Sequence, residues 1–176
     1  MPRVTAARVH PGGCLCSPQT CYNGLVQLNM GCGNHPLPHY LNLDLRLPCD
    51  LQLDLRDPLP FASHSIERIY AACAVCYLTL AEWERAKREW ARVLAPGGII
   101  EILEHNALGV LSQFLADPRQ RWTRWAETVW GSERYGFYQW MPTPDKLVSD
   151  FAAEGLTLAD AHNSDPLTIN MLFQKA

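Results

Sequence analysis

Short apolar stretches with the length of β-strands dominate the chain. Residues 25–30 form a short apolar run that predicts a buried strand, and two more strands are predicted at 66–72 and 99–103. Residues 40–45 and 50–55 instead alternate strictly between apolar and polar positions, which predicts strands with one solvated face. Two further strands are predicted near the C-terminus, on either side of a turn at 163–166, at positions 156–161 and 167–173.

Helical periodicity begins only after the fourth of these strands. Thr79 and Glu82 have the T-x-x-E spacing of a capping box, and apolar residues recur at helical spacing from there to residue 93. A proline and two glycines at 96–98 are expected to end this helix. Further helices are predicted at 106–116, at 118–130 and from Thr143 onward, where Thr is the N-cap and Pro follows it.

Strands that alternate with helices predict an α/β protein with a mostly parallel sheet. Only six residues separate the first strand from the second, and four separate the second from the third, too few for a helical crossover. Either these strands pair antiparallel, or their crossovers are short loops without helices. The strict alternation favours the second arrangement, because a sheet face without helices is solvated. We therefore expect the strands at 40–45 and 50–55 to run parallel to the strand at 25–30.

Composition and charge narrow the class of protein. The chain has 176 residues, of which 48% are hydrophobic and 19% charged, values that exclude a disordered chain. The net charge of −3 indicates no nucleic-acid partner and no anionic membrane partner. The longest apolar run, 69–80, is shorter than the ~20 residues that span a bilayer, and no signal peptide is recognisable. We expect a cytoplasmic protein with a poorly structured leader at 1–24 and one domain at 25–176.

Seven cysteines, an odd number in a chain without an export signal, indicate reduced thiols. Two groups have spacings that occur in metal sites: Cys14, Cys16 and Cys21 near the N-terminus, and Cys73 with Cys76 inside an apolar segment. A zinc site usually needs two matched ligand pairs. Ordinary buried or exposed thiols are therefore the favoured interpretation, and no metal is predicted.

A glycine turn and two carboxylates follow the first three strands. Gly31-Cys32-Gly33 directly follows a strand, where glycine lets the backbone approach a ligand closely. Asp44 and Asp54 end the next two strands, where a carboxylate can accept hydrogen bonds from ribose hydroxyls or an exocyclic amine. The alternative is that both are ordinary turn residues. Pro36 stands where the dinucleotide fingerprint needs glycine, which disfavours a nicotinamide oxidoreductase.

Five motifs follow one another in order: QLNMGCG at 27–33, YLNLD at 40–44, DL and PLPF between 54 and 61, SIERIY at 65–70, and EWARVLAPGG at 89–98. Together they resemble class I S-adenosylmethionine-dependent methyltransferases, in particular the compact methyltransferase-type-11-like subgroup. The resemblance covers roughly residues 25–104. It implies a Rossmann-like methyltransferase sheet that is mostly parallel with an antiparallel final strand, with helices reduced on one face.

The resemblance also implies S-adenosylmethionine as the cofactor and a set of residues that bind it. These are Gly31, Cys32 and Gly33 for the methionine part, Asp44 for the ribose hydroxyls, Asp54 and Leu55 for adenine, and Cys73 beside the amino-acid end.

The chain departs from its relatives after the fourth strand. Relatives often have a His and then a Glu-His pair there, and the matching positions are Cys73, Cys76 and Tyr77. Methyl transfer from a sulfonium depends mainly on positioning the acceptor, and a general base is optional. His105, just past the fifth strand, is the best candidate base; His39 and Tyr77 are weaker ones.

Residues 122–140 hold seven of the chain's 17 aromatic residues. In the family this stretch often helps to form the acceptor pocket, and aromatic faces favour planar, apolar or cationic acceptors. The expected acceptor-binding residues are Trp130, Tyr135, Tyr138 and Trp140. The alternative is that the segment, with Trp122 and Trp125 foremost, is hydrophobic core.

These observations predict a methyltransferase that uses S-adenosylmethionine and acts on a small-molecule acceptor. The alternative is a catalytically silent methyltransferase-like binding module or partner subunit, since the chain is short and lacks the Glu-His pair. The presence of both Asp44 and Asp54 argues against that alternative.

Overall fold

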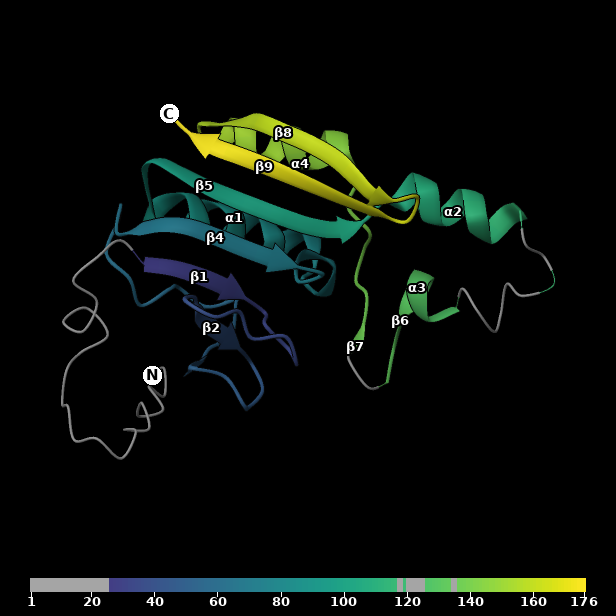
Figure 1. Cartoon of the computed structure of the whole chain (residues 1–176), viewed down its shortest axis with the longest axis horizontal. Coiled ribbons are helices and arrows are strands. Elements are labelled where there is room, and N and C mark those ends of the chain that lie inside the picture. Colours follow the sequence, from purple (N-terminus) through teal and green to yellow (C-terminus); the bar gives the residue numbers. More distant parts are fainter. Residues whose placement is uncertain (1–25, 117–118, 120–125, 134–135) are drawn as a thin grey trace.

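A computed structural model describes residues 26–116, 119, 126–133 and 136–176 (Figure 1). Two groups of predictions lie outside the described residues. One is the leader at 1–24 with Cys14, Cys16 and Cys21, and the other is the set of aromatic residues Trp122, Trp125 and Tyr135.

The described residues form one large sheet and one small one. The large sheet contains β1 (Val26–Met30), β2 (Leu41–Asp44), β3 (Leu51–Gln52), β4 (Ile66–Ala72), β5 (Leu94–His105), β8 (Leu156–Asp165) and β9 (Thr168–Lys175). The small sheet pairs β6 (Gly131–Ser132) with β7 (Gly136–Phe137). The helices are the short 3-10 helix η1 (Val75–Tyr77), α1 (Leu80–Val93), α2 (Ala107–Ala116), α3 (Ala126–Trp130) and α4 (Pro144–Ala153).

The strand order of the large sheet is β3-β2-β1-β4-β5-β9-β8. β1 pairs parallel with both β2 and β4, β2 with β3, and β4 with β5, whereas β9 is antiparallel to β5 and to β8. The predicted parallel arrangement with short crossovers is therefore confirmed, as is the antiparallel final strand. As a result, the C-terminal ends of β1 to β5 meet at one edge of the sheet (Figure 1).

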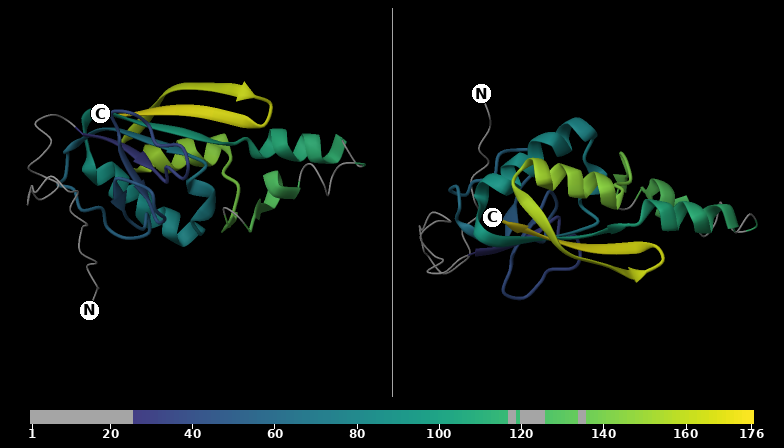
Figure 2. Two further views of the ribbon diagram at one scale, coloured as in Figure 1. Left: turned by 60° about the horizontal axis from the view of Figure 1, so that its bottom comes forward. Right: turned by 90° about the horizontal axis from the view of Figure 1, so that it is seen from above.

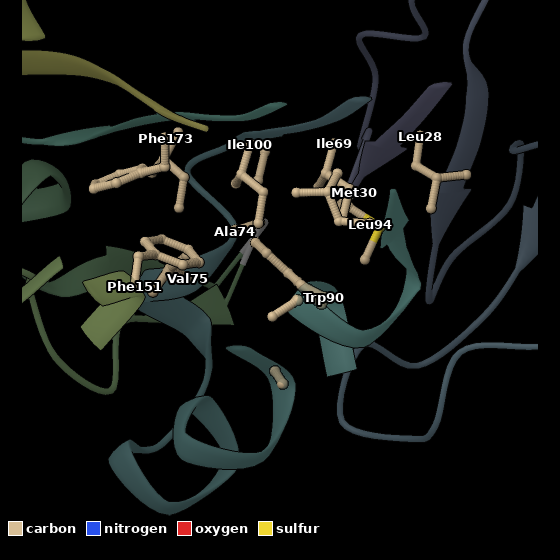
Figure 3. Close-up of a cluster of buried hydrophobic side chains, with 14 of the residues drawn as sticks. Leu28, Met30, Ile69, Ala74, Val75, Trp90, Leu94, Ile100, Phe151 and Phe173 are labelled. Carbon is tan, nitrogen blue, oxygen red and sulfur yellow. The ribbon is translucent and has the colours of Figure 1, made fainter. Parts of the chain in front are cut away.

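Helices α1 and α4 lie against the same face of the sheet (Figures 1 and 2). No helix in the described part of the chain covers the opposite face. The core lies between this face and the two helices; Trp83, Trp90, Phe151 and Phe173 are fully buried there (Figure 3 shows part of it). Burying a large apolar side chain contributes about 1.5–3 kcal/mol, so these contacts fix the sheet that positions the site. None of the helices in the described part is long and apolar enough to cross a membrane.

Both predicted N-caps are confirmed, whereas the described part of the helix predicted at 118–130 is helical only over α3 (Ala126–Trp130). At the start of α1, Thr79 and Glu82 form the capping box: the Thr79 amide donates to Glu82 Oε2 at 2.8 Å, and the Glu82 amide donates to Thr79 Oγ1 at 3.3 Å. At the start of α4, Thr143 Oγ1 accepts from the amide of Lys146 at 3.4 Å. These side chains satisfy amides that have no partner within the helix.

The strand predicted at 50–55 is wrong in extent, since β3 ends at Gln52. The Leu53 amide still donates to the Asp44 carbonyl at 2.9 Å, but Asp54 then accepts from the amide of Arg56 at 3.0 Å. This side-chain contact turns the chain away from the sheet, because an Asp side chain competes for backbone amides in turns.

Two strands are longer than predicted. β5 begins at Leu94 instead of residue 99, with a register shift against β4 between Ile66 and Arg68. β8 continues to Asp165, which moves the predicted turn at 163–166. The Asp165 carboxylate accepts from the amides of Leu167 at 2.7 Å and Thr168 at 2.9 Å, and it thereby makes the tight turn into β9.

The alternation in β2 predicted a solvated side for Asn42, and this is wrong: Asn42 is buried. Its Oδ1 accepts from Asn29 Nδ2 at 2.8 Å and from the Leu37 amide at 2.7 Å, and its Nδ2 donates to Asp50 Oδ2 at 2.8 Å. These contacts join β1, β2 and both short crossovers. A polar network thus fastens the crossovers where no helix packs on the sheet.

Candidate functional site

The turn after β1 is an open glycine loop. Gly31 and Gly33 have φ angles of +69° and +52°, in the left-handed region that favours glycine. A Cβ at Gly31 would lie 3.1 Å from Ala74 Cβ, whereas a Cβ at Gly33 would meet nothing within 4 Å. One end of the loop is therefore packed against the turn after β4. The other end leaves backbone open to a ligand.

Asp44 lies at the end of β2 and contacts this loop. Its Oδ2 accepts from the Gly33 amide and its Oδ1 from the Arg46 amide, both at 2.8 Å. The side chain is half-exposed, and each carboxylate oxygen has a further lone pair. Asp44 can therefore accept hydrogen bonds from vicinal hydroxyls while it holds the glycine loop.

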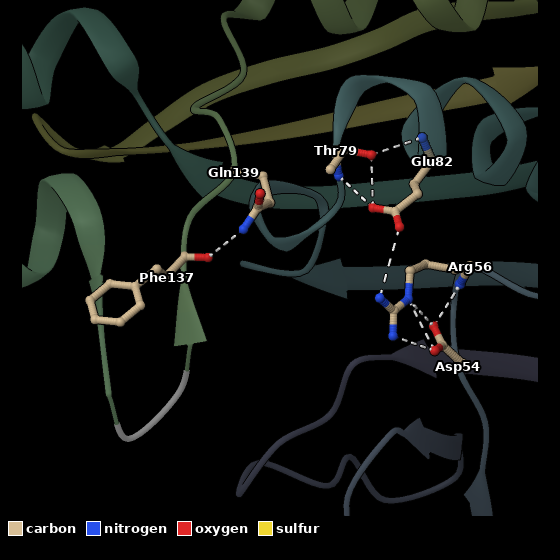
Figure 4. A network of polar contacts seen from close by, with 6 residues as sticks. All are labelled: Asp54, Arg56, Thr79, Glu82, Phe137 and Gln139. Atoms are coloured by element: carbon tan, nitrogen blue, oxygen red, sulfur yellow. Dashed lines mark hydrogen bonds and ion pairs between the residues drawn. The ribbon is translucent and has the colours of Figure 1, made fainter.

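Asp54 forms an ion pair with a residue that the sequence did not single out. Arg56 Nε donates to Asp54 Oδ1 at 2.8 Å, and Nη2 donates to Oδ2 at 2.6 Å (Figure 4). The hydrogen bond from Arg56 lowers the pKa of Asp54 despite the opposing effect of burial. Arg56 also lies 3.8 Å from Glu82. Asp54 is thus held ionised, with its two oxygens already bound to a guanidinium.

Leu55 and Cys73 both lie beside the glycine loop. Leu55 Cδ1 is 3.7 Å from the Cβ position of Gly31. Cys73 immediately precedes Ala74, has a φ of +48°, and donates its amide to the Leu103 carbonyl at 2.8 Å. The structure therefore brings Gly31, Gly33, Asp44 and Leu55 together with the turn after β4, as a shared binding site for one ligand requires.

The cysteines at this edge are neutral thiols. Burial raises the pKa of Cys32 to about 11 and that of Cys73 to about 12, and it also raises the pKa of Cys76. A thiol that stays protonated near neutral pH is a poor nucleophile and a poor metal ligand. Within the described residues, no three His, Cys, Asp or Glu side chains are placed to share a metal ion.

Glu104 is a site residue that the sequence analysis did not select. It is fully buried at the end of β5, and its Oε1 accepts from the Val75 amide at 2.8 Å. Burial raises the pKa of Glu104 to about 7, although the amides of η1 act in the opposite direction. The available signal was the two-residue period of β5: Ile100 and Ile102 are buried, and position 104 continues their face.

His105 belongs to a chain of three polar rings at the same edge. Its Nε2 lies 3.0 Å from the Tyr138 hydroxyl, and the side chain of Tyr138 in turn interacts with that of Tyr77. The rings of Tyr77 and Tyr138 meet edge to face, with centroids 5.2 Å apart. Burial lowers the pKa of His105, so its imidazole is neutral at pH 7. The Gln139 amide donates to the Cys76 carbonyl at 2.8 Å and ties this chain to η1.

The other aromatic candidates are dispersed. Trp130 is exposed and meets Phe114 edge to face, with centroids 5.7 Å apart. Trp140 is half-buried against the hydrophobic core, and its Nε1 has no hydrogen-bond partner among the described residues. His39 is an exposed loop residue ahead of β2. Tyr138 alone among the described aromatic candidates contacts His105.

A family profile described as a methyltransferase domain matches residues 39–102. This match begins in the loop before β2 and ends within β5, so it includes Asp44, Asp54, Leu55 and Cys73. A search of curated proteins gave no match.

Solved structures share the fold over most of the chain. A methyltransferase from Methanosarcina mazei is 14% identical, covers 85% of this chain and 91% of its own, and has a TM-score of 0.62. A methyltransferase from Thermotoga maritima is 12% identical, and the match covers 90% of this chain and 86% of that protein, with a TM-score of 0.60.

A third structure was solved with ligands. It is the 1,6-didemethyltoxoflavin-N1-methyltransferase from Burkholderia thailandensis, with bound 1,6-didemethyltoxoflavin and S-adenosylhomocysteine. It is 10% identical, and the match covers 86% of this chain and 71% of that protein, with a TM-score of 0.57. Residues 39–102 of this chain therefore resemble the methyltransferase domain, and the chain shares its fold with solved S-adenosylmethionine-dependent methyltransferases.

Proposed function

We propose that this protein transfers a methyl group from S-adenosylmethionine to a small-molecule acceptor. The domain match and the fold support S-adenosylmethionine as cofactor. The observation that supports the proposal most is the convergence of an open glycine loop with the Asp44 carboxylate at the C-terminal edge of a parallel sheet. Ligands of open parallel sheets bind at this edge.

The residues at this edge suit the parts of that cofactor. The open backbone at Gly33 would take the methionine part, and Asp44 would accept from the ribose hydroxyls. The Leu55 side chain and backbone would lie against adenine, next to Asp54. The cofactor supplies a methyl group that is already activated by the sulfonium, so the protein has to align the acceptor and exclude water.

The chain of Tyr77, Tyr138 and His105 is our candidate for the acceptor side. The two hydroxyls can orient a polar acceptor by hydrogen bonds. The neutral His105 imidazole can take up a proton by way of the Tyr138 hydroxyl when the acceptor loses one. Trp130 offers an exposed aromatic face for a planar acceptor.

Calorimetric titration with S-adenosylhomocysteine tests the cofactor assignment. Asp44→Ala removes charge-assisted hydrogen bonds worth roughly 1.5–3 kcal/mol, so the affinity should fall roughly 10- to 150-fold. Asp160→Ala is the matched control, because Asp160 is exposed on β8, the edge strand farthest from β3. Unchanged affinity in Asp44→Ala would remove Asp44 from the site.

A catalytically silent binding module is the second candidate, because Cys76 and Tyr77 stand where relatives have a Glu-His pair and the thiols nearby are neutral. The two candidates differ in turnover. A methyltransferase forms S-adenosylhomocysteine from S-adenosylmethionine when acceptors are supplied, and a silent module binds both compounds without any conversion.

A further inference from the structure

Glu104 is a buried acid whose position needs an explanation. It has no exposed surface, and its Oε2 has no partner with hydrogen-bond geometry among the described residues. Burying a carboxyl group is costly unless its contacts compensate. Strand pairing does not require an acid here, because the residue opposite Glu104 on β9 is the apolar Ile169. A buried acid with a raised pKa next to a candidate site points to a functional role.

The contacts of Glu104 all lead to the turn after β4. Its Oε1 accepts from the Val75 amide, the first residue of η1, and the Cys76 thiol lies beside the carboxyl group. Relatives often carry an acid within this turn, at the position of Cys76. An acid thus reaches the turn from β5 instead of from the turn itself.

The turn that Glu104 holds forms one wall of the glycine loop. Ala74 directly precedes Val75, and its Cβ lies 3.1 Å from the Cβ position of Gly31. Cys73, one residue earlier, has a left-handed φ of +48°, an unfavourable conformation that its surroundings must maintain. Leu103 and Glu104, neighbours on β5, each fix one end of this turn through a backbone amide.

We propose that Glu104 is a positioning residue for the cofactor: its ionised carboxylate holds η1 in place, and the turn at Cys73–Ala74 then shapes the glycine loop for S-adenosylmethionine and S-adenosylhomocysteine. This inference rests on the proposed function. It adds that the charge on a residue behind the binding surface sets the affinity for the cofactor.

The direction of the effect follows from the hydrogen bonds. A carboxylate accepts from an amide more strongly than a neutral carboxylic acid does, so ionised Glu104 holds η1 more firmly. The pKa of Glu104 is raised to about 7, so its charge changes near neutral pH. The titratable groups that face it in the described part are Cys73, Cys76 and Tyr77, and burial keeps all three protonated near neutrality. Affinity for the cofactor should therefore rise as the pH increases through 7.

The test is calorimetric titration of the full chain with S-adenosylhomocysteine between pH 6 and pH 8.5. If binding lowers the pKa of Glu104 by about half a unit, the affinity of the wild type rises about threefold across this range. Glu104→Gln keeps an acceptor oxygen but has no charge, and its affinity should stay at the low-pH value of the wild type. Glu67→Gln is the control: the same chemical change at an exposed residue of β4, near the opposite end of the strand from the site. It should retain the wild-type pH dependence.

His105 is the neighbour of Glu104 on β5, and burial lowers its pKa, so His105→Gln is measured alongside and should keep the dependence that Glu104→Gln loses. A wild-type affinity that is independent of pH, or a Glu104→Gln variant with the wild-type profile, would overturn the proposal.

A second measurement separates this proposal from the proposed function. In the wild type without ligand, the amide resonances of Val75 and Gly31 should titrate together with a midpoint near pH 7, and both should stop titrating in Glu104→Gln. If S-adenosylhomocysteine fails to bind at every pH, the proposed function fails. The amide titration then still decides whether Glu104 is coupled to the glycine loop. Amides that do not respond to pH would refute the coupling.

Discussion

Gly33→Ala tests whether the open end of the glycine loop is a binding surface. Gly33 has a φ of +52°, and alanine in this region costs about 1–2 kcal/mol. For a domain of this length, that cost lowers Tm by roughly 2–8 °C. The new Cβ meets no protein atom within 4 Å, so no packing cost is added. It would occupy the space of the ligand instead, and the loss of one hydrogen bond to the ligand weakens binding about tenfold.

Gly97→Ala is the matched control for this prediction. Gly97 has a φ of +75° and also has nothing within 4 Å of its Cβ position, but it lies near the start of β5, away from the C-terminal edge. Both variants should lose similar stability in thermal melts followed by circular dichroism. Only Gly33→Ala should lose affinity for S-adenosylhomocysteine in calorimetry. Equal affinities in the two variants would refute the assignment of the glycine loop.

Two further substitutions test the packing that supports the site. Asp150 accepts from Trp83 Nε1 at 2.8 Å and from Lys87 Nζ at 3.0 Å. Burial raises the pKa of Asp150, but these hydrogen bonds and the one from Lys146 lower it overall. Asp150→Ala should therefore lower the free energy of unfolding in urea by about 3–5 kcal/mol at pH 7. The difference in free energy of unfolding between variant and wild type should shrink as the pH falls below about 4, because Asp150 then becomes protonated and only its ionised form is stabilising. A difference that does not change with pH would contradict this. Asn42→Ala should cost about 1–3 kcal/mol, because it leaves Asn29 and Asp50 without their buried partner, and urea unfolding equal to that of the wild type would show that the network does not fasten the crossovers.

Features set by neighbours in the sequence could be predicted. The capping box at Thr79 and Glu82 and the N-cap at Thr143 follow from residues three positions apart, and the structure has both. The parallel β1–β2 pairing followed from the alternation of β2 together with the short crossover. The glycine loop and Asp44 could be placed at one edge because parallel strands bring their C-terminal ends together.

Contacts between distant parts of the chain could not be predicted. Asn42 was expected to face solvent because its partners, Asn29 and Asp50, lie on other segments. The ion pair of Arg56 with Asp54 joins residues only two positions apart, but it depends on a turn where the sequence predicted a strand through residue 55. Glu104 was overlooked because an acid next to a histidine at a strand end suggests an exposed loop. In the structure β5 continues to His105, so position 104 lies on the same buried face as Ile100 and Ile102.

The measurement that tests the central claim most directly is a titration of the isotope-labelled full chain with S-adenosylhomocysteine, followed by the shifts of backbone amide resonances. Saturable shifts should cluster at Gly31, Gly33, Asp44, Leu55 and Ala74, and the amides of the β8–β9 hairpin should not respond. Saturable shifts confined to other parts of the sheet, or no shifts at millimolar ligand, would contradict the cofactor site and the methyltransferase function proposed from it.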